Sequence, residues 1–288
     1  MRQALAGVYH PKNFTLFEWD FAVLMYELGG KGVTHALHNA PYALPARSSL
    51  TPVRRKTPIV ASSGSDIQIA EVLANMRSVF TADRVPSRRL LHTFCVDEIA
   101  IERRPSYNTS TDEILGLCRE HVGCLSSTKV GETLASAREA AKAVKDDRVH
   151  LGKEATVGAI AGDSRNDYGA KPILVSPTCK RSTWQDSALI QLTTVLCWLL
   201  SAVGETLQGP LASFSSDGDQ LRRMAMYFVC MRFIIEAGDP LYVIVGSLIG
   251  LNLYVGPLFI TMDFDWKHLL KRAFNCALLF SCVSDTCT

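Results

Sequence analysis

Hydrophobic residues recur at helical spacing in several parts of the chain, and these runs mark the predicted helices. Thr15 and Glu18 form a T-x-x-E capping box, a signature of a helix start, and Gly29-Gly30 is a stop signal. The predicted helical segments are 15–28, 33–39, 67–80, 132–145, 184–203 and 221–235. The last of these has apolar residues three and four positions apart, which predicts one buried face. The members of that face are Leu221, Met224, Phe228, Met231 and Ile235.

Shorter apolar runs separated by turn-forming residues predict strands in the middle of the chain. The predicted strands are 91–102, 114–118, 155–162, 171–178 and 210–216. The first four follow one another as a meander, and the last lies between two helices. This order predicts a mixed α/β sheet and not a doubly wound parallel one.

An acidic pair, Asp97 and Glu98, interrupts the first predicted strand, although acids are depleted in strands. Asp217 follows the last predicted strand, where open α/β sheets commonly place site residues. Two aspartates that meet repel each other unless a cation lies between them, and a pair of Mg²⁺ ions would suit phosphodiester cleavage. The alternative is that Asp217 and Asp219 form a turn and helix N-cap while Asp97 is a solvated acid. The spacing alone favours this alternative.

Composition narrows the function only a little. The chain has 288 residues, 48% of them hydrophobic, a formal charge of +2 and a pI near 8.1. This length suits one large domain or two small ones, and the charge neither requires nor excludes a nucleic-acid partner. The nine cysteines form no regular framework, and the N-terminus lacks the apolar core of a signal peptide. These features indicate reduced thiols in an intracellular protein.

Two uncharged segments, 188–204 and Leu241–Met262, raise the question of a membrane. The second is long enough to span a bilayer, but glycines, a proline and an asparagine interrupt it. We expect buried elements of a water-soluble fold in both places. Attachment to a membrane through Leu241–Met262 remains an alternative.

Two further groups of side chains suggest binding. Cys118, His121 and Cys124 form a C-x2-H-x2-C run, and Cys95 could lie one strand away; zinc could use such a set of ligands. Ordinary core and loop thiols are the more common explanation. Basic side chains that could contact phosphates, or could simply be solvated, are His268, Lys271, Arg272, Arg54, Arg55 and Lys56.

Several motifs resemble the RNase H-like core of P-element-type (THAP-associated) transposases. In that family, the segment before the core resembles LPARSSLTPVRR of this chain. The family's first catalytic strand and its return strand resemble VDEIAIERRPSYNTSTDEILGLC of this chain. The next two strands resemble HLGKEATVGAIAGDSRNDYGAKPILVSPT, the second aspartate resembles SFSSDGDQLRR, and a later motif resembles DFDWKHLLKRAFN. Most of the chain is also similar to fungal proteins that share HPKNF, GLCREH and DFDWKHLLKR, a likeness that brings no activity with it.

The resemblance implies that Asp97 and Asp217 are the first and second catalytic, metal-binding carboxylates of a site using Mg²⁺ or Mn²⁺. Its reaction would be DNA strand cleavage or transfer, DNA would be the partner, and the location would be nuclear. The third acid of the family lies well beyond the stretch containing His268, whereas this chain ends at Thr288. The family's N-terminal zinc finger has no counterpart, since residues 1–60 contain no cysteine. We therefore expect a degenerate or domesticated, catalytically incomplete protein, or a fragment.

The expected organisation has four parts. An N-terminal helical region covers 1–40, a basic, Pro- and Ser-rich linker with a helix covers 41–90, the RNase H-like core covers 91–237, and a truncated insertion covers 238–288. An interaction or structural protein that keeps only the fold is the main alternative, because a fold does not guarantee chemistry.

Overall fold

The computed structural model describes residues 14–40, 44–50, 59–80, 89–109, 111–164 and 169–265. The chain divides into two compact units, Met1–Pro58 and Ile59–Thr288. The first contains α2 (Leu16–His38), which begins at the predicted capping box: Thr15 Oγ1 accepts from Glu18 N at 3.3 Å, and Glu18 Oε2 accepts from Thr15 N at 2.6 Å. Gly30, with φ of 66°, interrupts α2 where the stop signal was predicted.

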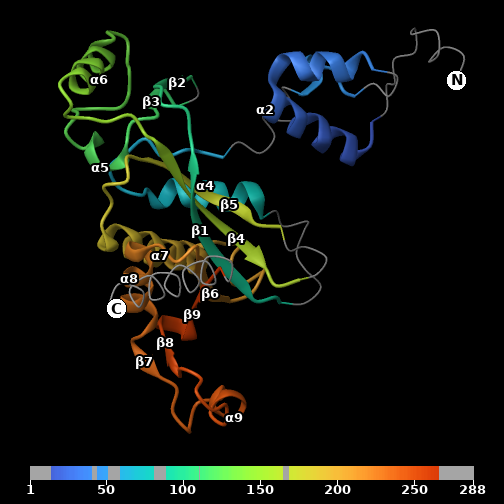
Figure 1. Ribbon diagram of the computed structural model, residues 1–288, viewed down its shortest axis with the longest axis vertical. Helices are drawn as coiled ribbons and strands as arrows, with labels where there is room; N and C mark the ends of the chain where they lie inside the picture. The colour runs from blue at the N-terminus through green and yellow to red at the C-terminus, as the bar shows by residue number, and fades with distance from the viewer. Residues whose placement is uncertain are drawn as a thin grey trace, which may run out of the picture. The chain divides into compact units, whose positions relative to one another are not determined.

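The second unit is built on a five-stranded sheet with the order β5-β4-β1-β6-β9 (Figure 1). Its strands are β1 (His92–Ala100), β4 (Glu154–Gly162), β5 (Lys171–Thr178), β6 (Leu211–Ser216) and β9 (Thr261–Phe264). β1, β4 and β5 pair antiparallel, whereas β6 runs parallel to β1 and β9 runs parallel to β6. The expected fold class, an RNase H-like mixed sheet with a meander followed by strand-helix units, is confirmed.

Helices α4 (Ile69–Val79), α7 (Trp184–Leu200) and α8 (Gln220–Cys230) bury their apolar sides together with one face of the sheet. In β1, Phe94 and Val96 belong to this core, whereas Cys95 and Asp97 alternate to the other face. The largest fully buried side chains of this unit include Trp198, Phe94, Phe214, Met76 and Ile160. Trp198 Nε1 donates to Gly209 O at 2.9 Å, which satisfies its polar group inside the core.

The predicted buried face of α8 is wrong. Leu221, Met224 and Phe228 are 36%, 42% and 41% exposed. The buried stripe lies about one position further along and consists of Arg222, Ala225, Met226, Val229 and Cys230. The helix ends at Cys230, before β7 (Phe233–Ile234), so Ile235 is not part of it. Two apolar stripes run along this helix, and its periodicity alone could not decide which of them faces the sheet.

Two smaller groups of elements extend from opposite ends of the sheet, one between β1 and β4 and the other between α8 and β9 (Figure 1). Between β1 and β4 lie the hairpin β2 (Ser106–Asn108) and β3 (Glu113–Leu115), then α5 (Arg119–Val122) and α6 (Ala135–Lys145). They share a small core made of Ile114, Leu117, Val122, Ala140, Ala143 and Val149. We call this group, residues 106–151, the β2–α6 lobe.

The uncharged segment Leu241–Met262 consists of short elements. It contains α9 (Tyr242–Val245), β8 (Tyr254–Val255), the 3-10 turn η2 (Pro257–Phe259) and the first residues of β9. Within the described ranges, no helix has the length and apolar character needed to cross a membrane. The segment's large apolar side chains are mostly exposed, with Val243 at 83%, Ile244 at 68% and Leu248 at 54%, so the expectation that this segment is buried is wrong.

Candidate carboxylate site

The structure brings Asp97 and Asp217 to the same end of the sheet. The parallel pairing of β1 with β6 ends at Val96 and Ser216, so these two acids are the next residues on each strand. β6 stops there and turns into α8, while β1 continues to Ala100. The side chain of Asp97 is 71% exposed and that of Asp217 is 30% exposed.

The turn after β6 has the local structure expected for a helix start. Ser216 Oγ accepts from Gly218 N at 3.1 Å, and Asp217 Oδ1 accepts from Asp219 N at 3.0 Å. Asp219 is the N-cap of α8, with Oδ2 accepting from Leu221 N at 2.9 Å. Gly218 has φ of 74°, which favours glycine here. The predicted turn and N-cap are thus confirmed.

A buried arginine, Arg222, lies between the two acids. Its Nη1 is 4.0 Å from Asp97 Oδ1 and 3.9 Å from Asp217 Oδ1. Its Nη2 forms an ion pair with Glu98 Oε1, and Nη1 also donates to Val96 O. The cation that the two aspartates share in this structure is therefore a guanidinium.

The position of Arg222 has a physical explanation in its surroundings. A buried arginine needs partners, and its charge in the first turn of α8 opposes the helix dipole. Asp217 and Glu98 compensate for this charge, and Val96 O lies just where the β6 ladder ends. Sequence reasoning missed both Arg222 and Glu98 as site residues. For Glu98, the acidic pair in β1 was the available signal. Consecutive strand residues point to opposite faces, so one of the two acids had to face the helices.

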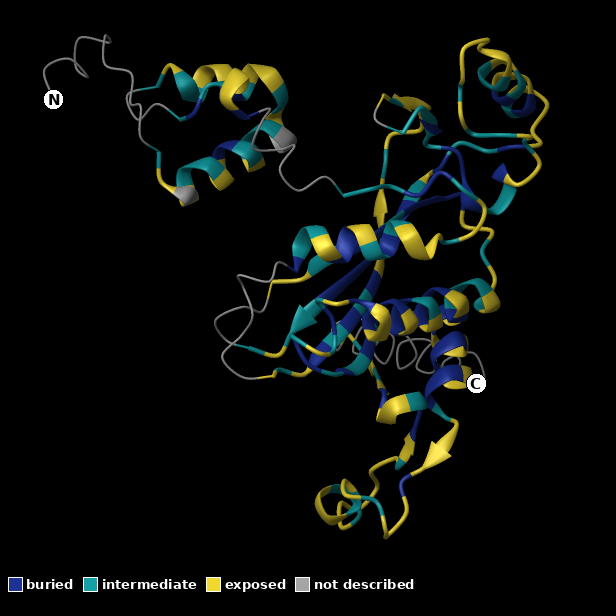
Figure 2. Cartoon of the chain, turned by 180° about the vertical axis from the view of Figure 1, so that it is seen from behind, coloured by how far each residue is buried: buried dark blue, intermediate teal, exposed yellow. Residues whose placement is uncertain are grey.

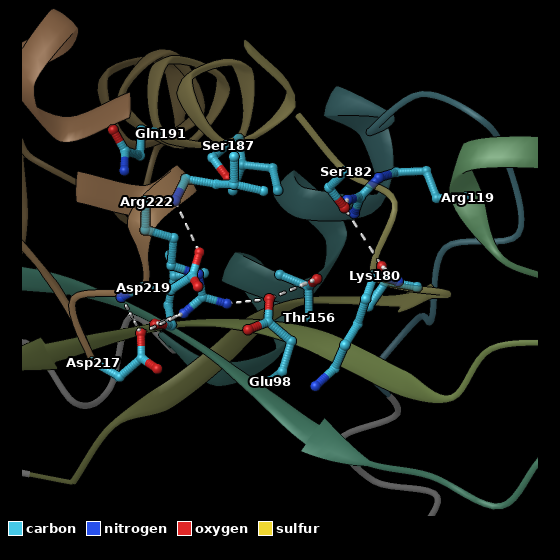
Figure 3. A pocket seen from close by; sticks show the side chains of 14 residues that line it. Glu98, Arg119, Thr156, Lys180, Ser182, Ser187, Gln191, Asp217, Asp219 and Arg222 are labelled. Atoms are coloured by element: carbon cyan, nitrogen blue, oxygen red, sulfur yellow. Dashed lines mark hydrogen bonds and ion pairs between the residues drawn. The ribbon is translucent and has the colours of Figure 1, made fainter. Parts of the chain in front are cut away.

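Glu98, Asp217 and Arg222 line one end of a cavity of about 300 Å³, whereas Asp97 is not among its lining residues (Figure 3). Arg119 and Lys180 lie toward its other end. The charged residues lining it are Glu98, Asp217, Asp219, Arg119, Lys180 and Arg222, so acidic and basic groups balance. Gln191 also lines the cavity; it is buried, and its Oε1 has no hydrogen-bond partner among the described residues. The cavity can accept a small polar group, but its charge balance selects neither anions nor cations.

The remaining candidates divide into two groups. Arg54, Arg55, Lys56, His268, Lys271 and Arg272 lie outside the described residues. Cys118 and His121 do come together, but His150 and Cys179 complete their group. Cys124 is exposed, and Cys95 is half-buried in β1, where burial and then Asp263 raise the pKa of its thiol. Of the C-x2-H-x2-C run and Cys95, the structure therefore places only Cys118 and His121 in this group.

No protein-family model matches the chain, and no curated protein matches it. Among solved structures, the chain is similar to one from a Drosophila P element transposase strand transfer complex, with a TM-score of 0.41 and 14% identity. The match covers 95% of this chain and 46% of that one, so the chain spans about half the length of the protein it resembles.

Proposed function

We propose that this protein is a degenerate, transposase-like DNA-binding protein whose RNase H-like core does not cleave DNA. The observation that carries the proposal is Arg222, whose guanidinium lies within 4.0 Å of both candidate catalytic carboxylates. A nuclease of this type needs a divalent metal at that place. Here the protein supplies the positive charge itself.

The carboxylates alone would suit Mg²⁺, since hard oxygen ligands are what it prefers. The guanidinium does not fit beside such an ion. At a separation of about 4 Å and an effective dielectric constant of about 20, a doubly charged ion and an arginine repel by about 8 kcal/mol. Arg222 is held in place by Val96 O and Glu98, so it cannot move away without losing both contacts. We therefore derive no metal-dependent step at this site.

DNA is the partner that the transposase resemblance suggests, and part of the described surface supports it. Arg103, Lys153 and Arg181 line a second cavity of about 310 Å³ beside His150. Grouped basic side chains attract phosphates by a charge interaction that salt weakens. A nuclear location belongs to this proposal, because it follows from DNA as the partner.

A plasmid-nicking assay with Mg²⁺ or Mn²⁺ tests the missing cleavage. We expect the wild-type chain and Asp97→Asn to leave supercoiled DNA equally intact. Metal-dependent nicking by the wild-type chain that disappears in both Asp97→Asn and Asp217→Asn would contradict the proposal.

Fluorescence anisotropy with duplex DNA tests binding. Affinity should fall at least about tenfold between 50 and 200 mM salt, because phosphate contacts release counterions. Arg103→Gln with Arg181→Gln should weaken binding, whereas Arg104→Gln, a neighbouring arginine paired with Glu102 at 3.2 Å, serves as the control. Absent or salt-independent binding rules out DNA as the partner.

Exposed leucines on α7 favour the second candidate, an interaction protein that keeps only the fold. Leu192, Leu196 and Leu199 are 45%, 44% and 41% exposed, and exposed positions recur along this helix (Figure 2). Contiguous apolar surface of this kind marks protein contacts. Sedimentation equilibrium would reveal self-association, and loss of that association in Leu192→Glu and Leu196→Glu would support this candidate.

A further inference from the structure

Four side chains of the metal-ligating types meet where three separate segments of the chain come together. Cys118 precedes α5 and His121 lies within it, His150 precedes β4, and Cys179 follows β5. One ligand atom from each lies within 4.8 Å of the other three. Cys118 Sγ and Cys179 Sγ are 3.2 and 3.6 Å from His121 Nδ1, and the rings of His121 and His150 have centroids 4.2 Å apart.

We propose that Cys118, His121, His150 and Cys179 form a structural zinc site. Two thiolates and two imidazoles are a common zinc ligand set, and they fill the four tetrahedral positions without leaving one open for catalysis. Zinc bonds of about 2.3 Å to sulfur and 2.05 Å to nitrogen place these atoms about 3.6 Å apart in a tetrahedron. The two sulfur-to-nitrogen distances, 3.2 and 3.6 Å, lie close to this value.

The backbone around the cluster is fixed by contacts that do not involve the four ligand atoms. Cys118 N donates to His150 O at 2.9 Å beside the bridge between Leu117 and Leu151. Cys179 N donates to Glu120 Oε2 at 3.2 Å, which ties α5 to the end of β5. The ligands are thus brought together by the fold, so little ordering is left for the metal to impose.

A neighbouring carboxylate adds a feature that is common around zinc. Asp147 Oδ1 lies 3.4 Å from His150 Nε2. Metal-binding histidines usually donate their second ring N–H to a carboxylate or carbonyl, which fixes the ring and its tautomer. Zinc at His150 Nδ1 would leave Nε2 for Asp147.

Ordinary core thiols in this protein have different surroundings. Cys197 and Cys230 belong to the main apolar core. Cys118 and Cys179, in contrast, have imidazoles beside them. They also lie next to the β2–α6 lobe, whose core has only six buried members, two of them alanines. Small cores often need a metal or disulfide to hold them. Zinc would connect the β2–α6 lobe to the carboxyl end of β5.

Metal analysis of the full-length chain tests this site and does not depend on DNA binding. We expect about one zinc ion per chain, and a cobalt-reconstituted sample should show thiolate-to-metal charge transfer and the d–d bands of a tetrahedral site. Less than about one-tenth of an equivalent after reconstitution under reducing conditions overturns the proposal. The proposal is also overturned if the chain, kept without reductant, contains a disulfide between Cys118 and Cys179 and binds no metal.

Variants separate this ligand set from the C-x2-H-x2-C run. Cys179→Ser and His150→Ala should lose zinc, whereas Cys124→Ser should keep it. His150→Cys should keep zinc as a Cys3His site, which shows that loss in His150→Ala comes from the missing ligand and not from misfolding. Zinc retained in Cys179→Ser and His150→Ala but lost in Cys124→Ser would refute the assignment.

Discussion

Replacing Arg222 by glutamine tests whether this side chain stands in for a metal ion. The substitution removes the positive charge between Asp97 and Asp217 and leaves Glu98 without its ion-pair partner. We expect two results: the fold loses stability, and the freed carboxylates gain affinity for Mg²⁺. Arg223, the next residue on α8 and an exposed one, provides the matched control Arg223→Gln.

The size of the destabilisation follows from the contacts of Arg222. Removing one partner of a buried ion pair costs about 3–5 kcal/mol, and a lost hydrogen bond costs about 1 kcal/mol. The carboxylates retain exposed fractions of 29% for Glu98, 30% for Asp217 and 71% for Asp97, so water can hydrate them. We therefore expect Arg222→Gln to lower the free energy of unfolding by about 2–3 kcal/mol, less than for a fully buried pair.

Urea unfolding followed by tryptophan fluorescence measures this loss. If Arg222→Gln binds Mg²⁺ with a Kd of about 1 mM, then 10 mM Mg²⁺ returns about 1.4 kcal/mol. The wild-type chain and Arg223→Gln should show no such gain. The gain should also disappear when Asp97→Asn is added to Arg222→Gln, because the metal then loses one of its two carboxylates.

Two outcomes would refute the reasoning. Equal stability of Arg222→Gln and the wild-type chain would show that the guanidinium is not held as the structure describes. A gain from Mg²⁺ in the wild-type chain, as large as that in Arg222→Gln, would show that the arginine does not exclude a divalent ion.

Three other substitutions test the fold around the site. Gly158→Ala should cost about 1–3 kcal/mol in urea unfolding, because its Cβ would lie 2.8 Å from the Phe94 ring, whereas Gly169→Ala, with nothing within 4 Å, should change little. Burial raises the pKa of Glu71, so its ionised form opposes folding; Glu71→Gln should raise the thermal midpoint at pH 7, and this gain should vanish below the unfolded-state pKa of 4.5. Thr183→Ala removes the capping box of α7 and should cost about 1 kcal/mol, whereas an unchanged urea midpoint would contradict the role of the cap.

Local patterns of the sequence predicted most elements of the fold. The capping box at Thr15, the strands at 154–162 and 171–178 and the helix from Trp184 all lie where the pattern placed them. Helix caps and strand alternation depend on neighbours in the sequence, which explains this agreement. The helix predicted from residue 132 begins only at Ala135, because Leu134 adopts a left-handed conformation with φ of 53°.

The site was predictable only in part. The acidic pair and the aspartate after β6 pointed to Asp97 and Asp217, and their shared position follows once β6 pairs parallel to β1. Nothing in the sequence pointed to Arg222 as a site residue. The neighbouring stripe of Leu221, Met224 and Phe228 fitted the pattern of a buried helical face better than the stripe that contains Arg222. Only half of the Cys118, His121, His150 and Cys179 group was predictable, because Cys118 and His121 are three residues apart while His150 and Cys179 are distant in sequence.

The sequence by itself determined where helices and strands form and which residue types are available for chemistry, because these depend on side chains a few positions apart. The tertiary structure alone decided which side chains meet. Sheet pairing placed two aspartates at the same end of the sheet, helix packing brought Arg222 within 4.0 Å of both, and the end of β5 brought Cys179 to His121. Such contacts join residues far apart in the chain, so no local periodicity records them.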